Sequence, residues 1–184
     1  MAYYYNINNE KDSAFLSYEL SKQIYTNLGD SAKIGENLTQ MAIIQSDFGD
    51  YSGSDYNAVE ALKYLKKNNE QYLNSIYNCL AISSRKQKDF HEAIYWYDKA
   101  ISISTNNLSI VTCQNNKANA LRDLKEYDKS ITLLSELLND TILINNPITK
   151  ARIIDNLAFT KLLANKNAAV LPDLLNALSI RKTE

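Results

Sequence analysis

The chain has 184 residues, of which 45% are hydrophobic and 22% are charged, with a formal net charge of −1. A chain of this length can bury a substantial core as one domain, and its near-zero charge excludes the strong positive field typical of nucleic-acid-binding domains. The scarcity of glycine (4) and proline (2) disfavours a turn-rich all-β fold.

Apolar residues recur at spacings of three and four along most of the chain, which predicts amphipathic helices. Polar segments interrupt this pattern at 27–31, 47–54, 66–71, 85–90, 104–109, 122–128, 139–147 and 164–169. The first predicted helix covers 12–28, and the last begins near Leu171 or Pro172, because proline is tolerated in the first helical turn. No run alternates with period two, so the sequence predicts an all-α protein of about nine helices.

The segment KDFHEAIYWYDKAI (88–101) has a counterpart in KEYDKSITLLSELL (125–138). In both, an aromatic residue is followed by a small residue, an apolar residue and a large residue at the same offsets. The matched pairs are Phe90 and Tyr127, Ala93 and Ser130, Ile94 and Ile131, and Tyr97 and Leu134. GDYSGSDYNAVEAL (49–62) and NKNAAVLPDLLNAL (165–178) follow the same offsets, although Asn167 stands where the aromatic residue is expected. The chain therefore contains an internal repeat.

This repeat resembles the tetratricopeptide repeat, a helix–turn–helix unit of about 34 residues. That family places a small residue midway along the first helix, an aromatic residue at the start of the second, and small residues where the two helices touch. The matching residues are Ala42, Ala81, Ala118 and Ala158 for the first position, Tyr51, Phe90 and Tyr127 for the second, and Ala61, Ala93, Ala100 and Ala177 for the third. Small residues allow close approach of two helices. Ser54 and Ser130 depart from the pattern, because each replaces an expected alanine.

The resemblance implies a right-handed α–α superhelix, a solenoid that forms a single domain over 1–184. Its repeats are expected at 35–68, 74–107, 111–144 and 151–183, after a partial N-terminal repeat at 12–34. On this interpretation Phe90 and Tyr97 pack in the core, while His91 lies on an exposed first turn. Trp96 lies on the outer side of its helix pair, where it either covers a neighbouring loop or belongs to a contact patch.

The sequence lacks the patterns that accompany enzymatic chemistry. With one histidine there is no HExxH zinc motif, and neither a phosphate-binding glycine loop nor a GxSxG elbow is present. Cys79 and Cys113 lie in helical, partly apolar contexts and are expected to be small buried residues. Acidic pairs such as Asp47 and Asp50 fall at turns, where solvation or helix capping accounts for them. We therefore expect no catalytic function, no cofactor and no metal.

A solenoid of this kind presents a concave groove lined by its first helices, and we expect a protein or peptide ligand there. The predicted groove residues are those opposite the packing alanines: Asn78, Arg85, Asn115, Asn119, Arg122 and Asp155, together with Thr39, Ile43, Ser46, Ile82, Phe159 and Leu162. Asparagine can pair with a peptide backbone, and arginine can form a bidentate pair with a carboxylate. The alternative is that these are ordinary polar residues on a hydrated surface. Ile82 stands where the carboxylate clamp of chaperone-tail receptors would have asparagine.

The stretch from Asp12 to Ser54 is similar to repeat arrays that precede a membrane helix in Bacteroidetes signalling proteins, which carry histidine-kinase or helix-turn-helix output domains further on. This resemblance implies a sensory or input region of a larger bacterial signalling protein. The alternative function is a free-standing adaptor that scaffolds a protein complex. We expect a soluble chain without a membrane span of its own, cytoplasmic by default and extracytoplasmic if it is such an input region. The oligomeric state stays open.

Overall fold

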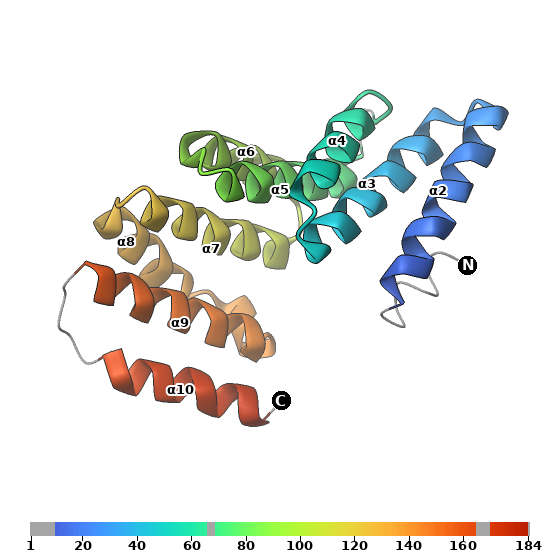
Figure 1. Ribbon diagram of the computed structural model, residues 1–184. Coiled ribbons are helices and arrows are strands. Elements are labelled where there is room, and N and C mark those ends of the chain that lie inside the picture. The colour runs from blue at the N-terminus through green and yellow to red at the C-terminus, as the bar shows by residue number, and fades with distance from the viewer. Residues whose placement is uncertain (1–9, 66–68, 165–169, 184) are drawn as a thin grey trace. The chain divides into compact units, whose positions relative to one another are not determined.

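The computed structural model describes residues 10–65, 69–164 and 170–183, which form nine α-helices and a short 3-10 helix without any strand (Figure 1). The α-helices are α2 (Lys11–Leu28), α3 (Ser31–Phe48), α4 (Tyr51–Leu62), α5 (Glu70–Lys86), α6 (Phe90–Ile103), α7 (Asn107–Asp123), α8 (Tyr127–Leu137), α9 (Pro147–Leu163) and α10 (Val170–Thr183). The predicted all-α fold, the number of helices and the start of the last helix are confirmed. Asn167 and positions 66–68 of a predicted polar break lie outside the described residues.

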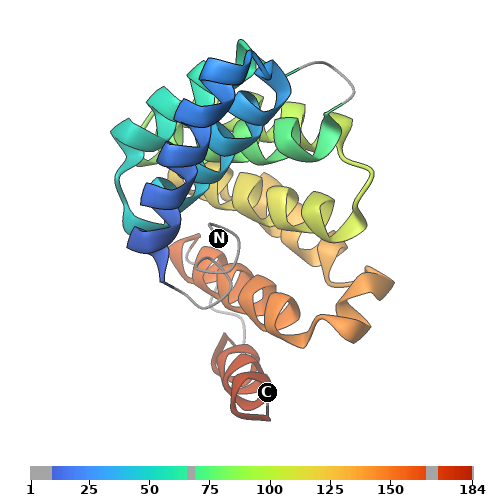
Figure 2. The same cartoon turned by 90° about the vertical axis from the view of Figure 1, so that its right-hand side faces the viewer.

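The chain divides into two compact units, Met1–Ser104 and Thr105–Glu184. In the first unit α2 to α6 each pack on the next helix, and α3 also packs on α5. In the second unit α7 packs on α8 and α9, and α9 packs on α10. Figures 1 and 2 show α2 alongside α3, and α10 alongside α9. We call α3, α5, α7 and α9 the first helices and α4, α6, α8 and α10 the second helices.

The alanines predicted to lie between paired helices are all fully buried, so the helix register of the repeat is confirmed. They are Ala42, Ala81, Ala118 and Ala158 on the first helices and Ala61, Ala93, Ala100 and Ala177 on the second helices. Tyr97 is also buried, whereas His91 is exposed. A methyl side chain lets two helix backbones approach closely, which explains why alanine recurs at these contacts.

The two serines that replace an expected alanine have a structural explanation. The hydroxyl groups of Ser54 and Ser130 are buried and donate to the carbonyl oxygens of Ala42 and Ala118, each at 2.8 Å. Serine is small enough for a close helix contact and adds a hydrogen bond that alanine cannot form. The same bond therefore joins the first and second helix in both repeats.

Four tight turns with the same hydrogen bonding join α2 to α3, α3 to α4, α5 to α6, and α7 to α8. Each contains one left-handed residue, namely Gly29, Gly49, Lys88 or Lys125. The next residue donates its backbone N–H to a carbonyl five residues earlier, which is the Schellman arrangement. At three of the turns an aspartate caps the following helix: Asp30, Asp50 and Asp89. The predicted capping role of Asp50 is thus confirmed.

The segment between α8 and α9 differs from the predicted polar break at 139–147. It contains the 3-10 helix η1 (Thr141–Asn145), capped by Asp140. Leu143 of this helix is buried in the core cluster that also contains Val111, Leu134 and Ile153. Five residues are enough to place one leucine in the core but too few to show a helical period in the sequence, which is why this helix was not predicted.

Candidate binding faces on the first helices

The six predicted groove residues lie on the first helices of both units. Asn78 and Arg85 are partly buried on α5 of the first unit. Asn115, Asn119 and Arg122 lie on α7 of the second unit, and Asp155 lies on α9. The packing of α7 on α9 brings the four residues of the second unit onto one helix pair, and this pair forms the better-defined face.

Arg122 is the centre of this face. Its Nη1 donates to Asn119 Oδ1 at 2.8 Å, and its guanidinium lies over the ring of Phe159 on α9 at 4.9 Å from the ring centroid. Its Nε also lies 3.5 Å from the carboxylate of Asp123. One guanidinium therefore joins an amide, a carboxylate and an aromatic ring, which fixes its position before any partner arrives.

The expectation that these groove residues are exposed is wrong for Asn115, Asn119 and Arg122, which are all buried. Arg122 retains only 8% of its exposure, because α9 packs against α7 and places Phe159 against the guanidinium. The expectation is also wrong for Thr39, which is buried in the first unit and donates to the carbonyl of Gly35 at 2.8 Å. Burial and interactions within the chain therefore restrict how these side chains can contact a partner.

Asn115 and Asp155 also have partners within the second unit. Asn156 Nδ2 on α9 donates to Asn115 Oδ1 at 2.9 Å, and Asp155 forms an ion pair with Arg181 on α10. The sequence prediction missed Asn156 and Arg181. The interhelical Asn–Asn bond had no local signal, because its two residues are 41 positions apart.

The most accessible of the predicted residues on this face are apolar. Phe159 is 49% exposed, and Leu162 and Leu163 follow it at the C-terminal end of α9 with comparable exposure. The face therefore consists of an accessible aromatic and aliphatic surface over a buried polar network. Aromatic side chains held in this way are frequent anchors of protein interfaces.

The first unit carries a different, polar pocket of about 380 Å³ between α2, α3 and α5. It is lined by Tyr18, Ser21, Tyr25, Lys33, Glu36, Asn37, Gln40, Gln71 and Tyr72. Lys33 and Glu36 form an ion pair at 2.7 Å. Burial raises the pKa of Tyr72, and the charge of Glu36 raises it further. The sequence prediction missed this pocket, although Lys33, Glu36, Asn37 and Gln40 share one helix face by their spacing.

Trp96, whose role the sequence left open, packs against the first helix of its own pair. Its ring stacks on Tyr77 of α5 with centroids 5.5 Å apart and meets Tyr95 edge-on at 5.0 Å. Its indole N–H donates to Glu92 at 3.2 Å. Trp96 of α6 therefore packs, with Tyr77, against the core cluster that α3, α4 and α5 form.

Within 10–65, 69–164 and 170–183, no three His, Cys, Asp or Glu side chains are arranged to hold a metal ion. None of the helices in these ranges is both long enough and apolar enough to cross a membrane.

Stacked helix pairs with buried alanines at their contacts define a helical-repeat protein. Residues 72–140, from within the first turn of α5 to just past the end of α8, match the family model of the tetratricopeptide repeat. No curated protein sequence matches the chain. The predicted family is thus confirmed for the repeats in the middle of the chain.

Solved structures share the fold over nearly the whole chain. BtubC (BKLC) from P. vanneervenii has a TM-score of 0.72 at 20% identity, over 95% of this chain and 74% of that one. RapI in its apo form has a TM-score of 0.73 at 17% identity, over 100% of this chain and 52% of that one. YrrB, described as a TPR protein with an unusual peptide-binding site, has a TM-score of 0.62 at 13% identity, over 98% and 83%. These TM-scores show a common fold, and at identities of 20% or less they show the fold alone.

Proposed function

We propose that this chain is a non-catalytic protein- or peptide-binding module that serves as the sensory or input region of a larger bacterial signalling protein. The observation that carries the binding function is the Arg122–Phe159 arrangement of the second unit. There the guanidinium of Arg122 lies against one face of the Phe159 ring, and the ring remains half exposed. The tetratricopeptide family match and the fold shared with YrrB support a binding role.

On this proposal an extended segment of the partner lies across α7 and α9. Phe159 and Leu162 provide the apolar contact. Asn115 and Arg122 join α7 to α9, Asn119 orients Arg122, and Asp155 joins α9 to α10. Because the ring is already held over Arg122, binding costs little side-chain entropy. Asn78 and Arg85 are the proposed polar contacts in the first unit.

The test uses the whole chain as bait and measures how much of each recovered partner co-purifies. Phe159→Ser and Leu162→Ser should lower recovery, because each removes accessible apolar area from the face. Lys99→Ala is the matched control, since Lys99 is exposed on the second helix α6. Equal recovery by the face variants and the control would contradict the proposed site.

The signalling role is tested separately, by the gene that encodes the chain. A membrane span followed by a kinase or DNA-binding domain after this region supports the input function. A gene that encodes only this repeat region supports the predicted alternative, a free-standing adaptor.

A further inference from the structure

A second surface with binding character lies in the first unit, where the N-terminal end of α2 meets the C-terminal end of α3. Two adjoining cavities of about 510 and 420 Å³ share Asp12 and Phe48 in their walls. We call them together the α2–α3 groove. It is lined by Glu10, Lys11, Asp12, Ser13, Phe15 and Leu16 from the α2 side and by Ile44, Gln45, Asp47, Phe48 and Asp50 from the α3 side.

The floor of the α2–α3 groove is apolar, and two of its walls are large exposed hydrophobic side chains. Ile44 is buried, whereas Phe48 is 60% exposed and Leu16 is 64% exposed. Leu20 and Ile24 continue the exposed apolar surface along α2 at intervals of four residues, which keeps them on one side of the helix. A contiguous apolar surface of this kind, bordered by polar groups, marks a protein contact site.

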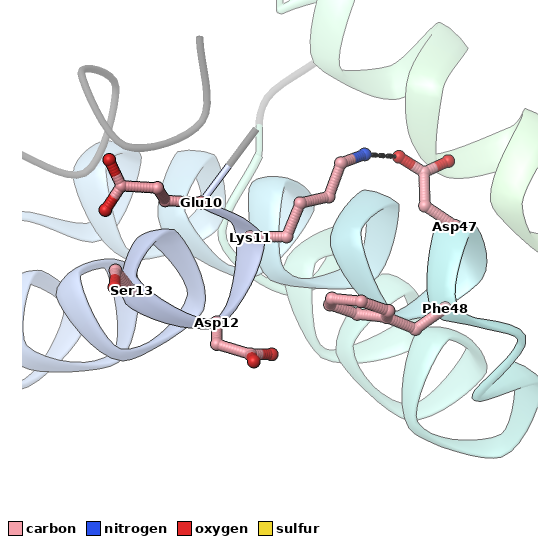
Figure 3. Close-up of a pocket in the computed structure, with 6 residues that line it drawn as sticks. All are labelled: Glu10, Lys11, Asp12, Ser13, Asp47 and Phe48. Atoms are coloured by element: carbon pink, nitrogen blue, oxygen red, sulfur yellow. Dashed lines mark hydrogen bonds and ion pairs between the residues drawn. The ribbon is translucent and has the colours of Figure 1, made fainter. Parts of the chain in front are cut away.

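The rim of the α2–α3 groove is acidic. Glu10, Asp12, Asp47 and Asp50 supply four carboxylates against the single ammonium group of Lys11. Lys11 is already paired with Asp47. Figure 3 shows this ion pair beside the ring of Phe48, with the carboxylates of Glu10 and Asp12 directed away from Lys11. The rim therefore presents net negative charge to anything that enters the groove.

These carboxylates differ in the hydrogen bonds and ion pairs that they already form within the chain. Asp50 accepts from Gln45 at 2.8 Å and caps α4 through the backbone N–H of Gly53 at 3.0 Å. Within the part of the chain that the structure describes, Glu10 and Asp12 take part in no ion pair. These two side chains are thus available to a cationic partner, Asp12 at the edge of the apolar floor and Glu10 in the adjoining cavity.

We infer that the α2–α3 groove binds an amphipathic basic segment of a partner protein. One large apolar side chain of that segment enters between Leu16 and Phe48, and its lysine or arginine side chains face Glu10 and Asp12. The apolar stripe of α2 accommodates the rest of the segment, as in the binding of an amphipathic helix in a groove. The acidic rim favours a basic segment over an acidic or neutral one, because specific interfaces pair surfaces of opposite charge. This site shares no residue with the Arg122–Phe159 face and does not depend on it.

The probe is a random peptide library displayed on phage and selected against the whole immobilised chain. Enriched peptides are then synthesised with a fluorescent label, and their affinity is measured by anisotropy. We expect them to combine a large apolar residue with lysine or arginine. Phe48→Ser and Leu16→Ser, on opposite walls, should each weaken binding by about tenfold or more, whereas Phe48→Tyr should retain it. Ile144→Ser, at a highly exposed isoleucine of η1, is the matched control.

A second experiment tests the acidic rim with the double variant Glu10→Gln/Asp12→Asn. This variant should weaken binding most at low salt and flatten its salt dependence, because exposed charges act through a screened field. Glu136→Gln on α8 is its control. Circular dichroism melts of every variant show whether a loss of binding comes from a loss of folding.

The inference is overturned if no enriched peptide keeps its affinity for Phe159→Ser, if the peptides that keep it are acidic or uncharged, or if those peptides bind Phe48→Ser and Leu16→Ser as tightly as Ile144→Ser. It is also overturned if sedimentation shows that the chain alone dimerises and that Phe48→Ser abolishes the dimer, since the occupant would then be a second copy. Phe159→Ser should leave peptide affinity unchanged, so failure of this site is distinguishable from failure of the proposed function.

Discussion

At the scale of single residues, Arg122 is a side chain predicted to line a binding groove that is instead buried within the fold. Its position on α7 suits a groove, but Phe159 and Asn119 enclose it. A buried guanidinium needs partners, because leaving any of its charge desolvated and unpaired is costly. The interactions that bury Arg122 make it a poor contact for a partner protein. The same interactions make it important for the stability of the fold.

Arg122→Ala should lower the free energy of unfolding by about 1–3 kcal/mol, because it leaves the buried Asn119 amide oxygen without its donor and uncovers one side of Phe159. Urea denaturation followed by circular dichroism measures this. Lys150→Ala, at an exposed lysine of α9, should stay within about 0.5 kcal/mol of the unchanged chain. Equal stability of the two variants would mean that Arg122 does not hold α9 against α7.

Cys79 is the second residue whose surroundings change its chemistry. It is buried on α5, and burial raises the pKa of its thiol to about 12. Cys113 is buried as well, so the prediction that both cysteines are small buried residues is confirmed. A thiol with this pKa carries almost no thiolate at neutral pH and is a poor nucleophile.

The raised pKa predicts a loss of stability in alkali. Between about pH 9 and 12 the thiol of Cys79 stays protonated in the folded chain but ionises in the unfolded chain, so unfolding releases a proton. Its contribution to stability is therefore present below pH 9 and declines as the pH rises, by at most about 1.4 kcal/mol per pH unit. Urea titrations over this range should give a steeper decline for the unchanged chain than for Cys79→Ala. An equal decline in stability for the unchanged chain and Cys79→Ala would contradict the raised pKa and would show that the thiol is in contact with water.

At the scale of elements, the four Schellman turns repeat one backbone geometry with two kinds of residue. Gly29 and Gly49 take the left-handed conformation without strain, whereas Lys88 and Lys125 adopt it at φ 69° and 68°. A non-glycine residue in this region costs about 1–2 kcal/mol. The turns between α5 and α6 and between α7 and α8 therefore store strain that the other two do not.

Lys88→Gly and Lys125→Gly should each raise the free energy of unfolding by up to about 1 kcal/mol, because relief of strain outweighs the greater freedom of glycine in the unfolded chain. Lys99→Gly, inside α6, should instead lower it by about 1 kcal/mol. Thermal denaturation of the three variants tests both signs. Destabilisation by all three would show that the lysine side chains themselves contribute to the turns.

At the scale of the whole molecule, each compact unit has core clusters of its own. Ile34, Ala58 and Ile76 belong to a cluster in the first unit, and Val111 and Leu134 belong to one in the second. In repeat proteins, stability is a sum of local terms and terms between neighbouring repeats. A substitution that disrupts packing in one unit should therefore destabilise that unit more than the other.

Leu134→Ala removes a fully buried side chain from the second unit and should cost about 2–5 kcal/mol. Amide hydrogen exchange measured by mass spectrometry should show lost protection in α7, α8 and α9, with a smaller loss in α3 and α4. An equal loss throughout would instead show that the chain unfolds as one cooperative domain, in agreement with the single domain predicted over 1–184.

Local pattern was sufficient to predict the helices, their pairing and the buried alanines. Helical period depends on residues three and four apart, and a close helix contact accepts only small residues such as Ala93. The same reasoning missed the short helix around Leu143, which is too brief to show a period.

Which polar side chains on the first helices face a partner could not be predicted in this way. Arg122 is covered by Phe159, 37 positions later in the chain, and Asn115 is paired with Asn156 across the same helix contact. The α2–α3 groove likewise joins Leu16 to Phe48, from two helices whose sequence patterns show nothing unusual. Exposure of a helix face is set by side chains that folding brings to it from distant parts of the chain, and helical period contains no information about which ones arrive.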